Sequence, residues 1–287
     1  MTAVPDVCGF FDNATNAVTY LVWDPASREA VIVDPVLDFD PASGRVERRS
    51  VRSVLDTARE RDVRIAYVLE THAHADHLSA APAIVEATGA KLGIGARICE
   101  VQRAFGPMFG ADDILPDGAD FDILLHEGDA LPLGELRIEV IEVPGHTPAD
   151  VAYRIGDAVF VGDSLFMPDY GTARTDFPGG DARQLYRSIQ KLLALPPETR
   201  LFMCHDYKAP GRDEFRWETT VAAELQNVHL AGGVTEDAFV AMRERRDATL
   251  ATPKLLLPSI QVNIRGGRFP PPAPNGQRHL RIPVQLT

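Results

Sequence analysis

Four side chains that commonly bind metals stand within six residues of one segment: His72, His74, Asp76 and His77. Neutral imidazole and carboxylate groups are the usual protein ligands of a borderline divalent metal at sites without thiolates. The segment directly follows the apolar run 64–70, which predicts a buried strand, and functional loops commonly follow such strands. A tight turn at this point can direct alternate side chains toward one centre, so the sequence predicts a metal-binding loop.

Three more candidate ligands each follow a β-like run elsewhere in the chain: His146, Asp163 and His205. Because the ends of neighbouring strands meet at one edge of a sheet, we expect these side chains to join the loop. Asp34, at the end of another predicted strand, is a candidate partner that orients a ligand histidine. The remaining histidines have no ligand-spaced neighbours and are interpreted as surface or core residues: His126, His229 and His279.

The elements that must position these residues are short strands and helices. Runs of β-branched, aromatic or alternating residues predict strands over 18–23, 30–33, 64–70, 91–94, 136–143, 151–155, 158–161 and 201–204. Apolar residues at helical spacing predict helices over 47–62, 79–88, 181–194, 213–229 and 235–247. Since the candidate ligands run from His72 to His205 and must converge, we expect one domain of two sheets over residues 1–250.

The last part of the chain, residues 251–287, is expected to be an extended Pro-rich tail that packs on this domain. Its segment 269–276 reads Phe-Pro-Pro-Pro-Ala-Pro-Asn-Gly and has neither helical nor strand periodicity.

Composition and charge exclude several classes of protein. The 287 residues are 45% apolar and 24% charged, close to the averages of globular proteins, which excludes a disordered or fibrous chain. The net charge of −12 disfavours binding to nucleic acid or to a membrane surface. Because no apolar run is long enough to span a bilayer and the start lacks a signal-peptide pattern, we expect a cytoplasmic protein. The three cysteines are expected to be small buried residues: Cys8, Cys99 and Cys204.

Together the candidate ligands resemble the signature of the metallo-β-lactamase superfamily, a His-x-His-x-Asp-His loop followed by a distant His, Asp and His. The matching residues are His72, His74, Asp76, His77, His146, Asp163 and His205. Asp34 matches an early strand-end Asp of the superfamily, and the resemblance spans residues 10–210. It implies an α/β (α+β) fold, a four-layer αββα sandwich with the metal at one edge of its two sheets.

The residues that flank the ligands look like the persulfide dioxygenase (sulfur dioxygenase) branch of this superfamily. That branch carries Arg174-Thr-Asp-Phe177 and His205-Asp-Tyr207 at these places, whereas glyoxalase II more often has Gly-His-Glu-Tyr at the second. One departure is the stretch 169–173, Asp-Tyr-Gly-Thr-Ala, where many relatives have Gly-Cys-Gly. This resemblance implies one Fe2+ per chain, held by His72, His146 and Asp163. The second site would be lined, without a metal, by His74, Asp76, His77 and His205.

The reaction that the resemblance implies converts glutathione persulfide, O2 and water into sulfite and glutathione. Because glutathione carries carboxylates, we expect the substrate to need donors near the metal, and the candidates are Arg174, Tyr207, Lys208 and Arg212. We also expect a homo-oligomer, with a dimer as one form, and a functional link to a sulfurtransferase.

The same ligand set fits a second reaction. In a dinuclear zinc glutathione thioester hydrolase of the glyoxalase II type, Asp163 would bridge two Zn2+ ions, and a bridging hydroxide would attack the thioester carbonyl. A metal-stabilised binding module is disfavoured because structural zinc sites are usually closed and often rich in cysteine. Hydrolysis of β-lactams is disfavoured because the chain shows no secretion signal.

Overall fold

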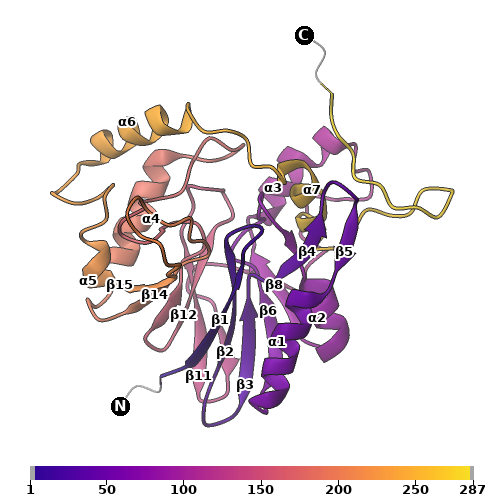
Figure 1. Cartoon of the computed structure of the whole chain (residues 1–287), viewed down its shortest axis with the longest axis horizontal. Coiled ribbons are helices and arrows are strands. Elements are labelled where there is room, and N and C mark those ends of the chain that lie inside the picture. The colour runs from indigo at the N-terminus through magenta and orange to yellow at the C-terminus, as the bar shows by residue number, and fades with distance from the viewer. Residues whose placement is uncertain (1–3, 285–287) are drawn as a thin grey trace.

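The computed structural model describes residues 4–284 and places most of their strands in two large sheets (Figure 1). In pairing order, the first sheet contains β1 (Asp6–Asp12), β2 (Ala17–Trp23), β3 (Glu29–Val33), β6 (Arg64–Leu69), β8 (Lys91–Gly95) and β9 (Ile123–Leu125). The second contains β10 (Ala130–Leu133), β11 (Leu136–Glu142), β12 (Val151–Ile155), β13 (Ala158–Phe160), β14 (Arg200–Phe202) and β15 (Glu218–Thr220). A small third sheet contains β5 (Arg45–Glu47), β4 (Val36–Asp40) and β7 (Leu78–Ser79).

The helices lie on the outer faces of the two large sheets (Figure 1). They are α1 (Arg49–Glu60), α2 (Ala81–Thr88), α3 (Ile98–Phe105), the short 3-10 helix η1 (Pro107–Phe109), α4 (Ala182–Leu193), α5 (Val221–Glu224), α6 (Glu236–Asp247) and α7 (Leu256–Asn263). Within residues 4–284, no helix is both long enough and apolar enough to cross a membrane.

Alternation along the strands builds the layers. In β2, Val18 and Tyr20 pack between the sheets with residues of the second sheet such as Tyr153, whereas Leu21 packs toward the helices. Helices α1, α2, α3 and α7 cover the first sheet, and α4, α5 and α6 cover the second. The expected four-layer αββα sandwich is therefore confirmed.

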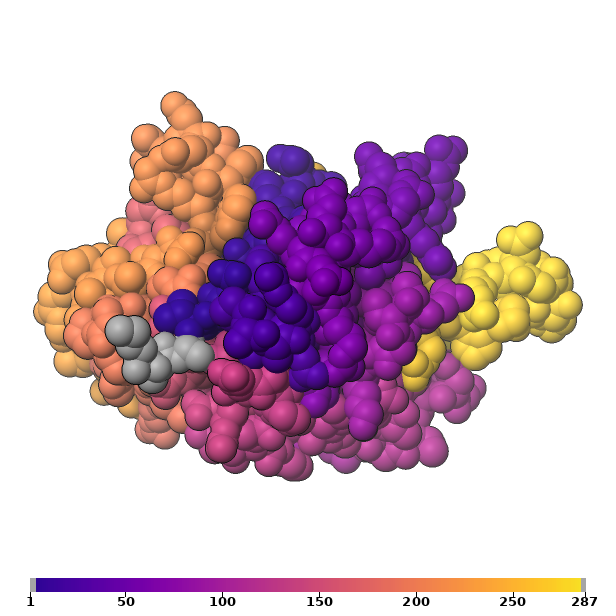
Figure 2. Space-filling view, turned by 90° about the horizontal axis from the view of Figure 1, so that it is seen from below, coloured from indigo at the N-terminus to yellow at the C-terminus, as the bar shows by residue number. Residues whose placement is uncertain are grey.

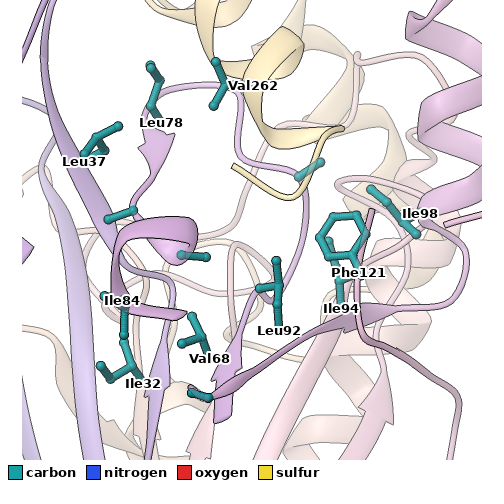
Figure 3. Packing of buried hydrophobic residues seen from close by; sticks show 14 of the residues in the cluster. Ile32, Leu37, Val68, Leu78, Ile84, Leu92, Ile94, Ile98, Phe121 and Val262 are labelled. Atoms are coloured by element: carbon teal, nitrogen blue, oxygen red, sulfur yellow. The ribbon is translucent and has the colours of Figure 1, made fainter. Parts of the chain in front are cut away.

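Figure 3 shows the core between the first sheet and its helices. Ile32, Val68 and Leu92 from the strands pack there with Ile84 of α2. Val262 of α7 belongs to the same core, so the C-terminal part of the chain contributes to this layer.

Helix α7 corrects the expectation that residues 251–287 form an extended tail. Residues 259–263 of this helix are all buried, so the helix has no polar face from which an amphipathic period could be recognised. After α7, residues 268–284 form no helix or strand, and this part of the chain protrudes from the side of the molecule (Figures 1 and 2).

The prediction of a helix over 213–229 is wrong for most of this range, because β15 and the one-turn helix α5 occupy its centre. β15 pairs with β14, and Thr220 then caps α5 by accepting a hydrogen bond from the backbone N–H of Ala223. The hairpin of β2 and β3 and the helices α1, α2, α4 and α6 confirm the corresponding sequence predictions to within a few residues.

Glu224 of α5 makes the stability of this fold sensitive to pH. Its side chain is fully buried, Oε2 accepts a hydrogen bond from Asn227 Nδ2 at 2.8 Å, and Oε1 has no partner among residues 4–284. Burial raises the pKa of this carboxyl to about 8. The folded protein thus retains a proton that the unfolded chain loses near its ordinary pKa of 4.5, so stability falls as the pH rises between these values.

We expect the neutral, similarly shaped variant Glu224→Gln to be more stable than the parent by about 2–4 kcal/mol above pH ~8, and to differ little at pH ~5. Urea unfolding at both pH values measures the difference. A stability change that is the same at the two pH values would contradict the assignment of a buried, protonated carboxyl.

Candidate metal centre

The seven candidate ligands converge at one edge of the two sheets because each follows the end of a strand. The loop after β6 carries His72, His74, Asp76 and His77. The other three follow β11, β13 and β14, and they are His146, Asp163 and His205. All except the half-buried Asp76 are at least nine-tenths buried. Gly162 permits this convergence, since its φ is +55° and a Cβ there would lie 2.8 Å from Thr71 Oγ1.

The first group of ligands consists of His72, His146 and Asp163, whose ligand atoms all lie within 4.8 Å of one another. Asp163 Oδ2 is 3.6 Å from His146 Nε2 and 4.0 Å from His72 Nε2. Two imidazoles and one carboxylate around one point form the ligand set of many non-haem ferrous sites, which leave further coordination positions open.

Hydrogen bonds fix which nitrogen of each imidazole faces this point. His146 Nδ1 lies 2.7 Å from the carbonyl oxygen of Arg174, which can only accept, so Nδ1 carries the proton. His72 Nδ1 lies 3.0 Å from Thr71 Oγ1, and that hydroxyl donates its own proton to Asp34 at 2.9 Å. His72 Nδ1–H must therefore donate to Thr71. Both rings are left with an Nε2 lone pair directed at the first group, as metal binding requires.

The burial of His72 agrees with this arrangement. Burial and the neighbouring histidines lower the pKa of His72 well below its ordinary value, so its imidazole is neutral. Its Nε2 is buried and has no hydrogen-bond partner within residues 4–284. A buried lone pair without a partner is costly unless a ligand such as a metal ion satisfies it. The residues of the first group therefore fit a divalent metal.

Asp34 holds the loop, as the sequence analysis expected of an orienting carboxylate. It accepts hydrogen bonds from the backbone N–H of Thr71 at 2.7 Å and from His74 Nε2 at 3.0 Å. Burial alone would raise the pKa of Asp34, but His74 and the bonds from Thr71 hold it below its ordinary value. An ionised Asp34 therefore sets the orientation of both His72, through Thr71, and His74.

A second group lies beside the first. His74, His77, Cys204 and His205 have ligand atoms within 4.8 Å of one another. His205 Nε2 is 3.1 Å from Asp76 Oδ2 and 3.5 Å from Asp163 Oδ1, so Asp163 faces both groups. Burial alone would lower the pKa of His205, but the carboxylates of Asp76 and Asp163 raise it well above its ordinary value.

Two members of this neighbourhood, Cys204 and Glu70, are not among the candidate ligands predicted from the sequence. Cys204 was expected to be a small buried residue, and it is buried, but its thiol also lies among the histidines of the second group. Glu70 Oε2 lies 3.3 Å from His74 Nε2, so this imidazole lies between two carboxylates. The available signals were the adjacency of Cys204 to His205 and the position of Glu70 directly after β6.

A cavity of about 500 Å³ opens above the first group, with His146, Asp163 and Asp76 in its lining. Aromatic side chains contribute to its wall, and they are Phe39, Phe166, Tyr170, Phe177 and Tyr207. The size and the mainly apolar lining are typical of a site for a small organic ligand.

Of the four substrate residues predicted from the sequence, the structure places Arg174 and Tyr207 in the cavity lining. The guanidinium of Arg174 is already engaged with Asp176 at 2.6 and 2.7 Å. Lys208 and Arg212 do not line the cavity. Lys208 Nζ lies over the ring of Phe215 at 4.3 Å.

Arg212 was predicted to bind substrate, but in the structure it pairs with carboxylates of the protein. Its guanidinium forms ion pairs with Asp206 and Asp169, at 2.6 and 2.7 Å. The three cations that the sequence analysis missed in the lining come from α6 and the segment after it: Arg243, Arg246 and Lys254.

Helix α6 fixes the loop that carries the Arg-Thr-Asp-Phe motif. Arg243 and Asp247 form a buried ion pair at 2.7 Å. Arg243 donates to the Thr172 carbonyl at 2.9 Å, and Asp247 accepts from the backbone N–H of Thr175 at 2.9 Å. Because the carbonyl of Arg174 lies between these two anchors and binds His146, α6 supports the orientation of a candidate ligand.

Comparisons with known proteins agree with this geometry. A family model described as the metallo-beta-lactamase superfamily matches residues 12–205. A protein of Burkholderia pseudomallei (strain 1710b), named a probable metallo-hydrolase, is 52% identical over 96% of this chain and 98% of its own length. The human mitochondrial persulfide dioxygenase ETHE1 is 32% identical over 69% of this chain and 66% of its own length.

Among solved structures, the crystal structure of ETHE1 from Myxococcus xanthus matches with a TM-score of 0.73 and 32% identity, over 92% of this chain and all of that one. Another relative, a beta-lactamase hydrolase-like protein of Agrobacterium fabrum, is 47% identical, and the match covers 99% of this chain. The chain spans only 66% of that relative's length.

Proposed function

Because the chain belongs to the metallo-beta-lactamase superfamily, we propose that it is a mononuclear iron persulfide dioxygenase that oxidises glutathione persulfide with O2. The observation that carries this proposal is the first group, in which His72, His146 and Asp163 offer two imidazoles and one carboxylate to a single point. The similarity to persulfide dioxygenases, in sequence and in fold, supports it.

The proposed reaction converts glutathione persulfide, O2 and water into glutathione and sulfurous acid, which ionises to sulfite. The S–S bond breaks, the terminal sulfur is oxidised by four electrons, and O2 accepts these electrons. Ferrous iron, when bound by the first group, supplies the redox-active centre with open coordination positions that such a reaction needs. Asp34 with Thr71, and the carbonyl of Arg174, keep the two imidazoles in the tautomer that binds a metal.

The aromatic side chains of the cavity wall also support the proposed function. Phe166, Phe177 and Tyr207 line the same cavity as Asp163. A wall of low polarity suits both the small, uncharged O2 and the sulfur end of the substrate.

A second candidate function, a dinuclear zinc glutathione thioester hydrolase, is favoured by the placement of Asp163. Its Oδ2 lies 3.6 Å from His146 of the first group, and its Oδ1 lies 3.5 Å from His205 of the second. A carboxylate that faces two groups of ligands can bridge two metal ions. The name of the Burkholderia relative, a probable metallo-hydrolase, points the same way.

Metal analysis and two assays separate these functions. The protein is purified without oxygen, and its iron and zinc contents are determined. We expect about one iron per chain, and consumption of one O2 with release of one sulfite for each glutathione persulfide. Zinc at two per chain, with O2-independent hydrolysis of S-lactoylglutathione and no O2 uptake by the iron-loaded protein, would contradict the dioxygenase and support the hydrolase.

A further inference from the structure

We propose that Arg246 and Lys254 form an anion-binding subsite at the edge of the cavity, and that this subsite selects a carrier thiol by its carboxylate groups. The inference rests on the proposed function for the identity of the reacting sulfur. It adds to the proposed function a binding site for the end of the substrate that does not react.

The cationic side chains of the cavity differ in whether a neighbouring carboxylate already pairs with them. Four cationic side chains line the cavity: Arg174, Arg243, Arg246 and Lys254. Arg174 is paired with Asp176, and Arg243 is paired with Asp247. Arg246 and Lys254 are exposed, and neither side chain forms an ion pair or a hydrogen bond with any other residue of the described range 4–284. These two cations are therefore free to meet an anionic group in the cavity.

The charge of the whole chain makes this arrangement informative. The chain carries 29 Lys and Arg against 41 Asp and Glu, so exposed cations on its surface are outnumbered by possible partners. The acidic residues of the cavity lining, Asp76 and Asp163, are in the metal centre. An anionic ligand that approached a chain of net charge −12 would be repelled unless local cations compensated.

The backbone holds Arg246 in a defined place. It lies three residues after Arg243 on α6, one turn from the ion pair that anchors this helix to Thr172 and Thr175. Side chains three residues apart lie on the same face of a helix. Arg246 is also close enough to Tyr170 of the cavity wall to oppose the effect of burial, which raises the pKa of that phenol.

Lys254 comes from the segment that connects α6 to α7. This segment crosses from the helices of the second sheet to those of the first (Figure 1), and Leu250, Ala251, Pro253 and Leu255 of the segment also line the cavity. Arg246, near the end of α6, and Lys254, on this segment, thus line the same cavity as the candidate metal ligands His146 and Asp163.

This geometry fits a thiol carrier that has a sulfur at one end and a carboxylate at the other. A guanidinium binds a carboxylate through two parallel hydrogen bonds, and an ammonium group adds a second positive charge. A peptide thiol such as glutathione meets these requirements, whereas a small thiol with only an amine, such as cysteamine, does not. We infer that the enzyme prefers acidic carriers over cationic carriers of the same reactive group.

The test uses neutral substitutions that keep much of the side-chain length: Arg246→Gln, Lys254→Gln and the double variant. Arg245→Gln is the matched control, because Arg245 is exposed on the same helix but is not among the lining residues. We expect each single substitution to raise KM for glutathione persulfide about tenfold, with kcat retained, since each removes one hydrogen bond between charged groups. The control is expected to retain the parental KM.

Calorimetric binding of glutathione to the iron-loaded protein separates this inference from the proposed function. We expect the parent to bind glutathione less tightly as the salt concentration rises, and the double variant to bind weakly with little salt dependence. If the parent consumes no O2 but the double variant still loses glutathione binding, the dioxygenase is wrong and the subsite stands. Equal glutathione affinity in parent and double variant, an equal loss in Arg245→Gln, or no glutathione binding by the parent would overturn the subsite.

Discussion

Replacement of Asp163 by asparagine is expected to empty the first group of its metal and to lower kcat/KM for glutathione persulfide by about a thousandfold or more. A bound metal stabilises transition-state charge by several kcal/mol, and each ~1.4 kcal/mol corresponds to a factor of ten. The substitution keeps the shape of the side chain but removes the only carboxylate among the three ligands of this group. The two remaining imidazoles are a weaker ligand set for a ferrous ion, because they offer one donor fewer and no negative charge.

Iron content after anaerobic reconstitution and O2 uptake measure this effect. Asp213→Asn is the matched control, because Asp213 is an exposed carboxylate outside the described cavity lining. The control is expected to keep the iron content and the activity of the parent. A variant Asp163→Asn that retained a full complement of iron would show that the metal is held elsewhere, and the second group around His205 would then be the place to search.

The convergence of the candidate metal ligands was predictable because it depends on local sequence. His72, His74, Asp76 and His77 are close in the chain, and a strand followed by a tight loop presents them together whatever the rest of the fold does. The more distant ligands, such as His146, could be placed because each follows a β-like run, and strand ends meet at a sheet edge. Both signals are short-range patterns that tertiary structure preserved.

The residues that support the ligands were not predictable in this way. Arg243 and Asp247 act on Thr172 and Thr175, about seventy residues earlier in the chain, and a buried ion pair on α6 has the same local pattern as a solvated one. The prediction that Arg212 binds substrate failed for the same reason, because local sequence does not show which side chains an arginine meets. An arginine close to a ligand histidine in sequence is instead paired with Asp206 and Asp169, and only the tertiary structure reveals these partners.

Helix α7 supports the candidate metal-binding loop itself. Its last residue, Asn263, is buried, and its Nδ2 donates hydrogen bonds to the carbonyl oxygens of His74 and His77, both at 2.8 Å. Its Oδ1 accepts a hydrogen bond from the backbone N–H of Ser79 at 2.9 Å. One amide therefore holds two backbone carbonyls of the loop that carries the candidate ligands and one backbone N–H of β7. Asn263 lies beyond residues 12–205, which the family model matches.

The variant Asn263→Asp is therefore expected to weaken metal binding, although Asn263 touches no candidate ligand side chain in its hydrogen bonds. The carboxylate has no protons to donate, so the carbonyls of His74 and His77 lose their donor and face a buried negative charge. Each unsatisfied buried group costs ~1–3 kcal/mol. Loss of groups that orient ligands typically reduces metal affinity about 10–100-fold, and we expect an effect of this size.

Gln261→Glu is the control that separates positioning of the loop from general damage to α7. Gln261 is as buried as Asn263 and lies on the same helix, but its Nε2 donates to the carbonyls of Leu257 and Arg281, away from the metal-binding loop. Both substitutions remove amide donors at a buried site, so both are expected to lower the midpoint of urea unfolding. Chelator competition then measures metal affinity under conditions where each variant is folded. If Asn263→Asp bound the metal as tightly as Gln261→Glu, the amide of Asn263 would stabilise α7 without positioning the ligands.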